Sequence, residues 1–548
     1  MGSRRALRAL AVALALVAIA CPNASGPVAG VPAGDVSMAG RLLAVHLAAV
    51  AALWAEHHGT RRAALEWIAV GLPAWTHLSF FPDPLAPLAL APFGVALLRA
   101  ESAAHRCLLA GLCAAAWMLG GAGWIFHYFD RPLLPSLIAL GVALALWLPA
   151  CLLVAVTLER SARWLPLAAA FWPATEWVRG SWLEPPLPGL FIAHANADGE
   201  LARLATRSGE LGVSYLVSLL ALGAALAWLR APTRVRPFAL SAIAIAGLAA
   251  GASPTPDPES AAGTRVCAVA DPKRHGRDTA PFSGGGDAAL RALSRSAVEQ
   301  HGCELTLLPE YSLALSESDL ITRDEGRRRP PSPPLLGGAS VSRRDERGRT
   351  TGVRNVVCRL HPDGIRGFVC ADPLDKLIFA PIGEVALFRG TQPLDALGQW
   401  LWRHATDAPA DSLHHTFFAP RVSGTVEIEG REVGAALCWE VLVPSLFERR
   451  GIRRREAALL VVLSDLGGFG DSREAIEQFR RAARHHAMRL ETPIVFAGTH
   501  GAFLIDADGR TLRPLTRDAF FTVWDVPLRA PVPPRGAERD EVAAAGST

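Results

Sequence analysis

Lysine is almost absent from this chain of 548 residues. Of its 55 lysine and arginine residues, only Lys273 and Lys376 are lysines, so nearly every other cation is supplied as arginine. A position that keeps lysine is therefore of interest, because a compact ammonium with movable donors differs from the planar fork of arginine. Two lysines can also remain by chance, so scarcity alone assigns no role to either one.

Charged residues are scarce as well. They make up 19% of the chain, against 51% apolar residues, and the mean hydropathy is +0.25. This composition is not typical of a soluble globular protein, and it indicates that part of the chain is embedded in a membrane. The net charge of +4 comes from a nearly even mix of signs. No basic stripe with interleaved aromatic residues occurs, so we expect no nucleic-acid partner.

Metal-ligand patterns are also missing. The nine cysteines contain no CxxC pair and no zinc-finger spacing, so we expect neither a metal nor another cofactor. Their odd number and scattered positions argue against a disulfide framework. Cys107, Cys113 and Cys151 lie in apolar runs and are expected in the core or facing lipid.

Long apolar runs fill the first half of the chain. They predict membrane segments at residues 6–20, 39–55, 64–80, 84–98, 107–127, 133–158, 164–178, 209–229 and 237–253. A full span needs about 20 residues, so 84–98 and 164–178 are short. Arginines follow the second, fourth, sixth and eighth segments, whereas the loops 21–38 and 81–83 carry none. The positive-inside rule then places the N-terminus in the cytoplasm and everything after residue 253 on the other side.

The first apolar segment fits two interpretations. The stretch MGSRRALRALAVALALVAIAC has a basic start, a short apolar core and small residues before Cys21. It is typical of a membrane anchor, and equally of a secretory signal of the lipoprotein type, for which Ala18 is a weak residue. Cleavage of a signal would leave the parity of the later spans unchanged.

The second half has the pattern of an α/β domain. TRVCAVADP, CELTLLPE and AALLVVLSD are typical of buried strands, and DAALRALSRSAVEQHG and DSREAIEQFRRAARHHAMRLE are typical of helices. Hairpin turns are predicted at Gly430 and at Asp508-Gly509. Strands that alternate with helices indicate an α/β domain.

These patterns divide the chain into five parts. We expect an extra N-terminal segment at 1–60, a multi-span membrane domain at 61–253 and a linker rich in proline at 254–264. A catalytic domain follows at 265–528, and a disordered tail at 529–548.

Three predicted strand ends carry reactive side chains. LTLLPE ends on Glu310, FVCADPLDK presents Lys376 and GAALC presents Cys438. A thiol, a carboxylate and an ammonium suffice for nucleophilic acyl transfer: the thiolate attacks, the carboxylate moves protons, and the ammonium holds the oxyanion. Each residue alone has a simpler explanation, because free cysteines are commonly core residues. The ordered set is what favours a catalytic site.

At this point the chain resembles the nitrilase superfamily, which carries Glu, Lys and Cys in this order. Together with the membrane half it resembles the apolipoprotein N-acyltransferases. The matching stretches are LLPE, LDKLIFAPIGE, CWE, SDLGGFGDS and GTHGAFLIDADGR, with LSFFPDPLAPLALAPF, GAGWIFHYFD and EWVRGSWL in the membrane half. The resemblance implies a polytopic α-helical membrane domain followed by an α/β nitrilase-like domain, a four-layer α-β-β-α sandwich.

The resemblance also implies roles for individual residues. Cys438 would be the nucleophile, Glu310 the base, and Lys376 the group that stabilises the tetrahedral intermediate. Glu384 and Glu440 match acids beside the site, and Trp439 stands where the family more often has Tyr. An acyl chain would pass from a phospholipid to a thioester on Cys438, and then to the N-terminal amine of a diacylglyceryl lipoprotein.

The resemblance further implies a monomer in the inner membrane of a bacterium, with its catalytic domain on the extracytoplasmic side. Several positions depart from the family pattern. Gly468 replaces a Trp in the SDLGGFG loop, and the helix motif RAxE reads His486-Ala487-Met488-Arg489. Two alternatives stay open at this point: a membrane-tethered amidase of the nitrilase type, and a non-catalytic relative that binds lipids.

Overall fold

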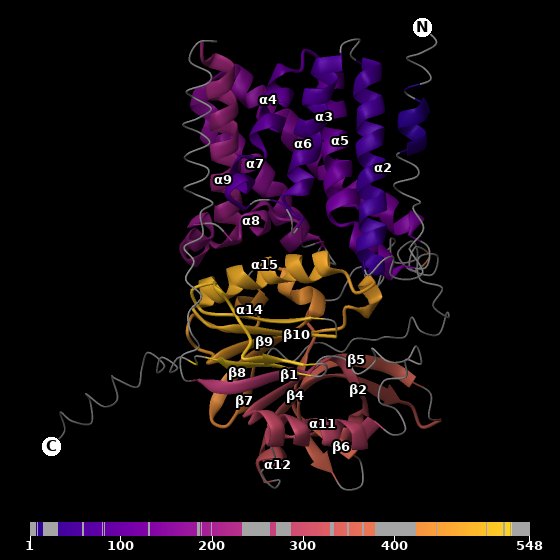
Figure 1. The fold of residues 1–548 in the computed structure, drawn as a ribbon, viewed down its shortest axis with the longest axis vertical. Coiled ribbons are helices and arrows are strands. Elements are labelled where there is room, and N and C mark those ends of the chain that lie inside the picture. The colour runs from indigo at the N-terminus through magenta and orange to yellow at the C-terminus, as the bar shows by residue number, and fades with distance from the viewer. Residues whose placement is uncertain are drawn as a thin grey trace, which may run out of the picture.

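The protein is built from a helical bundle and, below it in Figure 1, a domain of stacked sheets. The computed structural model describes residues 7, 9–14, 31–56, 60–78, 81, 83–129, 132–183, 187, 189–198, 200–232, 263–269, 286–328, 334–347, 350–363, 367–378, 400, 424–444, 446–499, 501–518, 521–526 and 528. Lys273, Glu384, the predicted span 237–253 and the predicted tail lie outside these residues, as does most of the segment 6–20.

The bundle consists of helices that are apolar on most of their surface. Its main helices are α2 (Ala33–Glu56), α3 (Thr60–Trp75), α4 (Ala91–Arg99), α5 (Ala103–Ala115), α6 (Leu133–Arg160), α7 (Leu165–Trp177) and α9 (Ala205–Arg230). Within the described residues, four stretches are long and apolar enough to cross a membrane: Asp35–Ala55, Ala103–Gly121, Leu133–Arg160 and Leu201–Arg230. Each overlaps a segment that the sequence predicts as a span.

The remaining predicted spans are short or broken in the structure. α3 has 16 residues with Pro73 inside it, and 84–98 is divided between the short helix η1 (Asp83–Leu88) and α4. α7 passes into the wider turn η5 (Val178–Trp182). One of the four long stretches, Ala103–Gly121, also ends irregularly: α5 continues through the wide turn η2 (Ala116–Gly121) into η3 (Gly123–Tyr128).

The second half folds into two sheets. The eight-stranded sheet has the order β13-β14-β1-β2-β4-β5-β6-β3, and the six-stranded sheet has the order β12-β11-β10-β9-β8-β7. The strands of the first are β1 (Thr264–Val269), β2 (Leu305–Ser316), β3 (Leu320–Ile321), β4 (Leu335–Arg344), β5 (Thr350–Asp363), β6 (Gly367–Asp375), β13 (Thr516–Arg517) and β14 (Phe521–Val526). Those of the second are β7 (Thr425–Ile428), β8 (Arg431–Leu437), β9 (Leu459–Ser464), β10 (Ile494–Gly498), β11 (Ala502–Ile505) and β12 (Thr511–Leu512).

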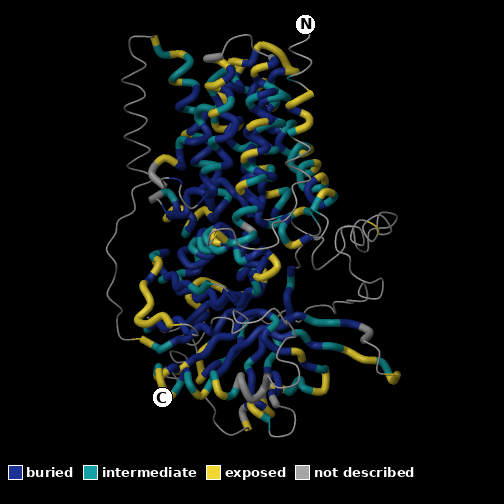
Figure 2. The backbone as a smooth tube through the Cα atoms, turned by 45° about the vertical axis from the view of Figure 1, so that its right-hand side comes forward, coloured by how far each residue is buried: buried dark blue, intermediate teal, exposed yellow. Residues whose placement is uncertain are grey.

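The two sheets pack face to face between two layers of helices. One apolar cluster joins Val266 and Leu307 of the first sheet to Val461 and Val495 of the second. The outer face of the first sheet is covered by α11 (Gly286–His301) and α12 (Arg323–Arg327), and that of the second by α14 (Leu446–Arg449) and α15 (Arg473–Leu490) (Figure 1). The fold is therefore the predicted four-layer α-β-β-α sandwich. Figure 2 shows that the strands are buried along most of their length.

The prediction that the cysteines form no disulfides is wrong. Cys267 is bonded to Cys303, and Cys358 to Cys370. The first pair joins β1 to the segment before its parallel neighbour β2, and the second joins the antiparallel neighbours β5 and β6. Strand pairing brings these cysteines together, and their spacing along the chain carries no trace of that pairing. Cys113 and Cys151 are buried in the bundle, as expected.

Helix α15 attaches the sandwich to the bundle, because backbone and side-chain groups along its length form hydrogen bonds with the bundle. The carboxylate of Asp35 on α2 accepts hydrogen bonds from the backbone N–H groups of Arg473 and Glu474 at the start of α15, at 3.1 and 3.3 Å. Further along, Gln478 donates to the carbonyl of Gly121 at 2.9 Å, and Arg481 donates to that of Thr76 at 2.9 Å. An acid at a helix N-terminus satisfies donors that the helix leaves free.

Asp198 forms the most highly charged of these contacts. It follows α8 (Ile192–Ala195) and binds Arg480 through both oxygens, at 3.0 and 2.7 Å, with Arg484 on one of the same oxygens. Burial alone would raise the pKa of Asp198, but Arg480, Arg484 and Arg481 outweigh that effect and hold it well below its usual value. The cluster therefore depends on an ionised carboxylate between three arginines.

We expect the substitution Asp198→Asn to lower the free energy of unfolding by about 3 kcal/mol, because it removes the ionised carboxylate that Arg480, Arg481 and Arg484 share. The depressed pKa adds a pH dependence. The contribution of Asp198 is fully present above its unfolded pKa near 4 and is lost as pH falls through the lower folded value. Thermal unfolding in lipid nanodiscs between pH 7 and pH 3 measures both effects.

Glu477→Gln is the matched control, because Glu477 binds the same Arg480 within α15 at 2.7 Å and does not reach the bundle. We expect it to cost less than about 1 kcal/mol. Equal losses in the two variants would contradict an interdomain role for Asp198.

Candidate active site

Glu310 lies inside β2, so the prediction that a strand ends on it is wrong. β2 pairs with β4 on both sides of this residue, but the register shifts between Leu308 and Leu313. Tyr311 takes a positive φ of 57° at the same point. The strand therefore bulges at Glu310, a device that re-aims side chains beside active sites. Gly338 on β4 permits the close approach, since a Cβ there would lie 2.5 Å from the Cα of Glu310.

Lys376 directly follows β6, as predicted, and reaches Glu310. Its Nζ donates to Oε1 of Glu310 at 2.9 Å, and both side chains are only 1% exposed. Asn355 on β5 connects the two residues. Its Nδ2 donates to the same carboxylate oxygen at 2.6 Å, and its carbonyl accepts from the backbone N–H of Lys376 at 2.8 Å. The buried acid and ammonium thus neutralise each other, as buried charges require.

Cys438 comes from the other sheet, at the end of β8. It begins the tight turn η10 (Cys438–Leu442) and has a positive φ of 46°. A non-glycine residue in this region stores about 1–3 kcal/mol of strain, which is typical of active sites. β9 lies parallel to β8, with Leu463 opposite Leu437, and beyond its end the N–H of Asp465 donates to Oε2 of Glu310 at 3.3 Å. The acid of one sheet is therefore bound at the strand ends of the sheet that carries Cys438.

Glu440 connects the Cys438 turn to the Lys376 loop. Its Oε2 accepts from the N–H of Leu437 at 2.8 Å, and its Oε1 accepts from those of Leu377 and Ile378 at 2.7 and 3.1 Å. Arg450 contacts both oxygens, at 2.8 and 2.7 Å, and Glu440 is fully buried. The carboxylate therefore binds the residue before the thiol and the two residues after the lysine.

We expect Glu440→Gln to lower the free energy of unfolding by about 3 kcal/mol, because Arg450 loses its buried counter-charge. The amide also presents two donors where the backbone N–H groups need an acceptor. Thermal unfolding of the purified variant in nanodiscs measures the loss. An unchanged unfolding temperature would contradict the structural role of this carboxylate.

Trp439 is a predicted site residue that lies in an apolar cluster. Trp439 is 3% exposed and belongs to an apolar cluster with Trp124, Phe479 and other residues that joins η10 to α15 and the bundle. Asn355 is the residue that sequence reasoning missed, because an asparagine in a strand carries no local signal of catalysis.

The loop SDLGGFG contacts the bundle directly. A Cβ at Gly468, where the family resemblance predicts Trp, would lie 2.6 Å from the ring of Tyr128. Next to it, Phe469 packs edge-to-face on Trp124, with ring centroids 5.0 Å apart. An aromatic residue of the bundle therefore occupies the space that a larger loop residue would need.

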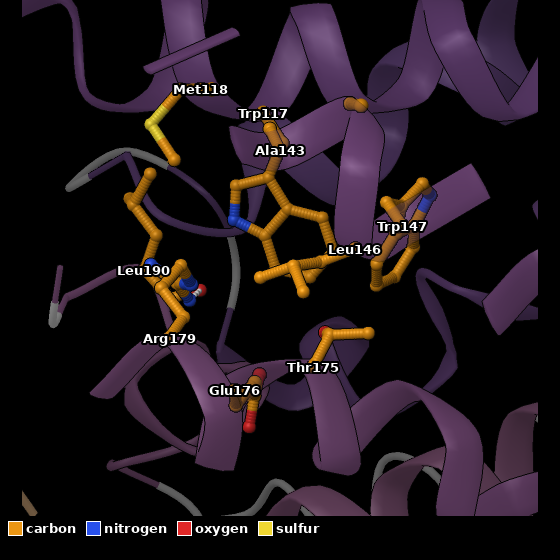
Figure 3. A pocket seen from close by; sticks show the side chains of 10 residues that line it. Trp117, Met118, Ala143, Leu146, Trp147, Thr175, Glu176, Arg179 and Leu190 are labelled. Atoms are coloured by element: carbon orange, nitrogen blue, oxygen red, sulfur yellow. Dashed lines mark hydrogen bonds between the residues drawn. The ribbon is translucent and has the colours of Figure 1, made fainter. Parts of the chain in front are cut away.

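A pocket lies in the bundle among α5, η2, α6, α7 and η5 (Figure 3). Its cavity volume is about 40 Å³. Apolar side chains form most of its wall, and Thr175, Glu176 and Arg179 lie together at one end: the lining consists of Ala114, Trp117, Met118, Ala143, Leu146, Trp147, Thr175, Glu176, Arg179 and Leu190.

The polar end of this pocket is connected to the turn that carries Cys438. Arg179 donates to the carbonyl of Gly189 at 2.6 Å, and Glu176 accepts from the N–H of Ile192 at 2.5 Å. A Cβ at Gly189 would in turn lie 3.5 Å from the side chain of Leu442, the last residue of η10. The loop at 189–192 therefore lies between the pocket and the turn.

Residues 69–223 match the family model of the apolipoprotein N-acyltransferase N-terminal domain. This part of the chain is similar to the N-terminal domain of the apolipoprotein N-acyltransferases. The match covers the bundle from α3 to most of α9 and includes the residues that line the pocket, so the predicted resemblance is confirmed. Among curated proteins, no sequence matches this chain.

Solved structures similar to this chain include two of the amidase from Nesterenkonia sp. AN1. One is a Glu-to-Gln mutant with the acetamide moiety of fluoroacetamide covalently added at the active-site cysteine. It is 14% identical, covers 53% of this chain and 99% of its own, and has a TM-score of 0.30. The other is the same mutant after Michael addition of acrylamide at that cysteine, with 14% identity, 51% and 99% coverage, and a TM-score of 0.28.

Proposed function

We propose that this protein moves an acyl chain from a phospholipid, through a thioester on Cys438, to the N-terminal amine of a diacylglyceryl-cysteine lipoprotein. The observation that carries the proposal is the buried contact of 2.9 Å between Lys376 and Glu310. It lies beside the strained turn of Cys438, in a domain docked directly on membrane helices. The proposed unit comprises a membrane domain at 61–253 and a catalytic domain at 265–528, and acts as a monomer.

In the first half of the reaction, Glu310 takes the thiol proton and the thiolate of Cys438 attacks the ester carbonyl of the phospholipid. Lys376 and backbone N–H groups hold the oxyanion of the tetrahedral intermediate. The bond from carbon to the glycerol oxygen breaks, and Glu310 returns its proton to that oxygen. A lysophospholipid leaves, and the acyl chain remains on the sulfur.

In the second half, the amine of the lipoprotein attacks the thioester carbonyl. Glu310 accepts a proton from the attacking nitrogen, and Lys376 again stabilises the oxyanion. The bond from carbon to sulfur breaks, and an amide is formed. The proton on Glu310 restores the thiol, so donor and acceptor use the same groups in turn.

The pocket of Figure 3 is suited to the lipid part of a substrate. Its walls are tryptophan, methionine, leucine and alanine side chains, and its polar end borders the loop that contacts Leu442 of η10. Apolar walls with a few placed polar groups are typical of ligand sites. We propose that a segment of an acyl chain lies along these walls.

Two observations support an extracytoplasmic catalytic domain in a bacterial inner membrane. Arg99, Arg160 and Arg230 close α4, α6 and α9 at the end of the bundle opposite to α15, which fits the positive-inside rule. The sandwich also contains two disulfides, which persist in oxidising compartments.

The experiment that tests the function is complementation of a bacterial strain depleted of its own lipoprotein N-acyltransferase. We expect growth to be restored and mass spectrometry to find triacylated lipoprotein N-termini. A membrane-inserted protein that leaves lipoproteins diacylated would contradict the proposal. Release of free fatty acid from phospholipid without transfer would instead identify a hydrolase.

A further inference from the structure

His486 is a buried residue to which the catalytic scheme gives no role. It lies on α15, is 1% exposed, and replaces the arginine that the family resemblance predicts at this position. Its Nε2 lies 3.0 Å from the carbonyl oxygen of Val441. A carbonyl can only accept, so this contact requires the proton to be on Nε2.

Val441 belongs to the turn that presents Cys438. A tight turn leaves its last carbonyl groups without partners inside the turn, so other groups must bind them. Glu440 already binds the start of this turn through the N–H of Leu437. His486 binds the other end, through the carbonyl three residues after Cys438. The strained backbone at Cys438 is thus held from both sides, and the second contact comes from another helix.

A carboxylate from the membrane bundle faces the same nitrogen. Oε1 of Glu210 on α9 lies 4.0 Å from Nε2 of His486, and its Oε2 lies 3.5 Å from Nε2 of His194 on α8. Glu210 is 5% exposed. The carboxylate of Glu210 and the carbonyl of Val441 therefore both face Nε2 of His486. The ring of Phe447 packs edge-to-face on His486, with ring centroids 5.4 Å apart.

The backbone of α9 is shaped to bring Glu210 to this point. Gly209 has a φ of 67°, which interrupts the helical geometry of α9 and which residues with a Cβ rarely adopt. A Cβ at this glycine would also overlap the guanidinium of Arg489, one turn of α15 beyond His486. Glycine is therefore favoured here by the backbone angle.

We propose that His486, oriented by Glu210, is a positioning residue that holds the Cys438 turn against the membrane bundle. Through this contact the position of α9 determines the position of the Cys438 thiol. In Figure 1, α15 lies between the bundle and the sheets. The inference rests on the proposed role of Cys438.

The test compares His486→Phe, which fills the space without a donor, with His486→Gln, which keeps an N–H at similar reach. We expect His486→Phe to slow acyl-thioester formation from phospholipid about 10- to 100-fold at unchanged donor KM, because small displacements of a reacting group cost this much. We expect His486→Gln to stay within about threefold of wild type. Failure of glutamine to restore the rate would overturn the proposal.

The matched control is His485→Phe. His485 is equally buried on the same helix, but its Nε2 contacts the carbonyl of Ala193 on α8, at 2.9 Å, and not the turn. We expect its thioester rate to stay within about threefold of wild type. An equal loss in His485→Phe would show that packing alone explains the effect.

A second measurement is independent of acyl transfer. We expect the rate of iodoacetamide alkylation at Cys438, followed by peptide mass mapping of the full-length protein, to fall about fivefold in His486→Phe and to recover in His486→Gln. Unchanged alkylation overturns the positioning role, even if the wild type transfers no acyl group. If His486→Phe does not fold, Glu210→Gln provides the same comparison, and a wild-type alkylation rate in that variant overturns the proposal.

Discussion

The variant Cys438→Ser is expected to lose acyl transfer by about 10⁴-fold or more, because a hydroxyl in place of the thiol cannot be activated by the same base at neutral pH. The turn itself should remain, since serine differs from cysteine by one atom and Glu440 and His486 bind the backbone beside it. The loss should therefore occur without a large change in unfolding temperature.

The measurement is the transfer of a labelled acyl chain from phospholipid to the purified protein. Wild type should carry a label that hydroxylamine removes, as expected of a thioester, and Cys438→Ser should carry none. Cys107→Ser is the matched control, because Cys107 is a half-buried free thiol in the bundle. A hydroxylamine-sensitive label that persists in Cys438→Ser would identify a different nucleophile.

The variant Lys376→Arg is expected to lose about 10²- to 10³-fold in turnover, the cost of removing one oxyanion donor. The Lys376 ammonium is 1% exposed and ends 2.9 Å from Glu310. A guanidinium is larger and planar, so it cannot keep that contact and also direct a donor at the oxyanion.

Single-turnover rates of thioester formation measure this loss. Lys273→Arg is the matched control, because it makes the same change at the only other lysine of the chain. We expect the control to keep wild-type rates. Full activity in Lys376→Arg would refute the idea that lysine is retained at this position for its compact charge.

Much of the architecture could be predicted from local patterns. Apolar runs of sufficient length marked the four candidate spans, and alternating strands and helices marked the sandwich. The predicted turn at Gly430 lies between β7 and β8, where both Glu429 and Gly430 have positive φ, as a tight hairpin requires. Such features depend on residues close together in the chain, so the sequence displays them directly.

The candidate site was only partly predictable. The structure places Lys376 and Cys438 directly after strands, and brings Lys376 onto Glu310. Their catalytic roles stay predictions. The bulge at Glu310 depends on the pairing of β2 with β4, and the role of Asn355 depends on the neighbouring strands β5 and β6. Strand pairing links residues far apart in sequence, so no local pattern reveals it.

The sequence by itself determined the two-part architecture, the order of Glu310, Lys376 and Cys438, and the resemblance to a family of N-acyltransferases. These depend on composition, periodicity and short motifs. Only the tertiary structure decided that the cysteines of the sandwich form two disulfides, that Glu440 binds both the Cys438 turn and the Lys376 loop, and that Glu210 and His486 connect a membrane helix to the Cys438 turn. Each of these contacts joins segments that are far apart in the sequence. The energy of such a contact depends on burial and on the distance between the two groups, and neither can be read from one segment alone.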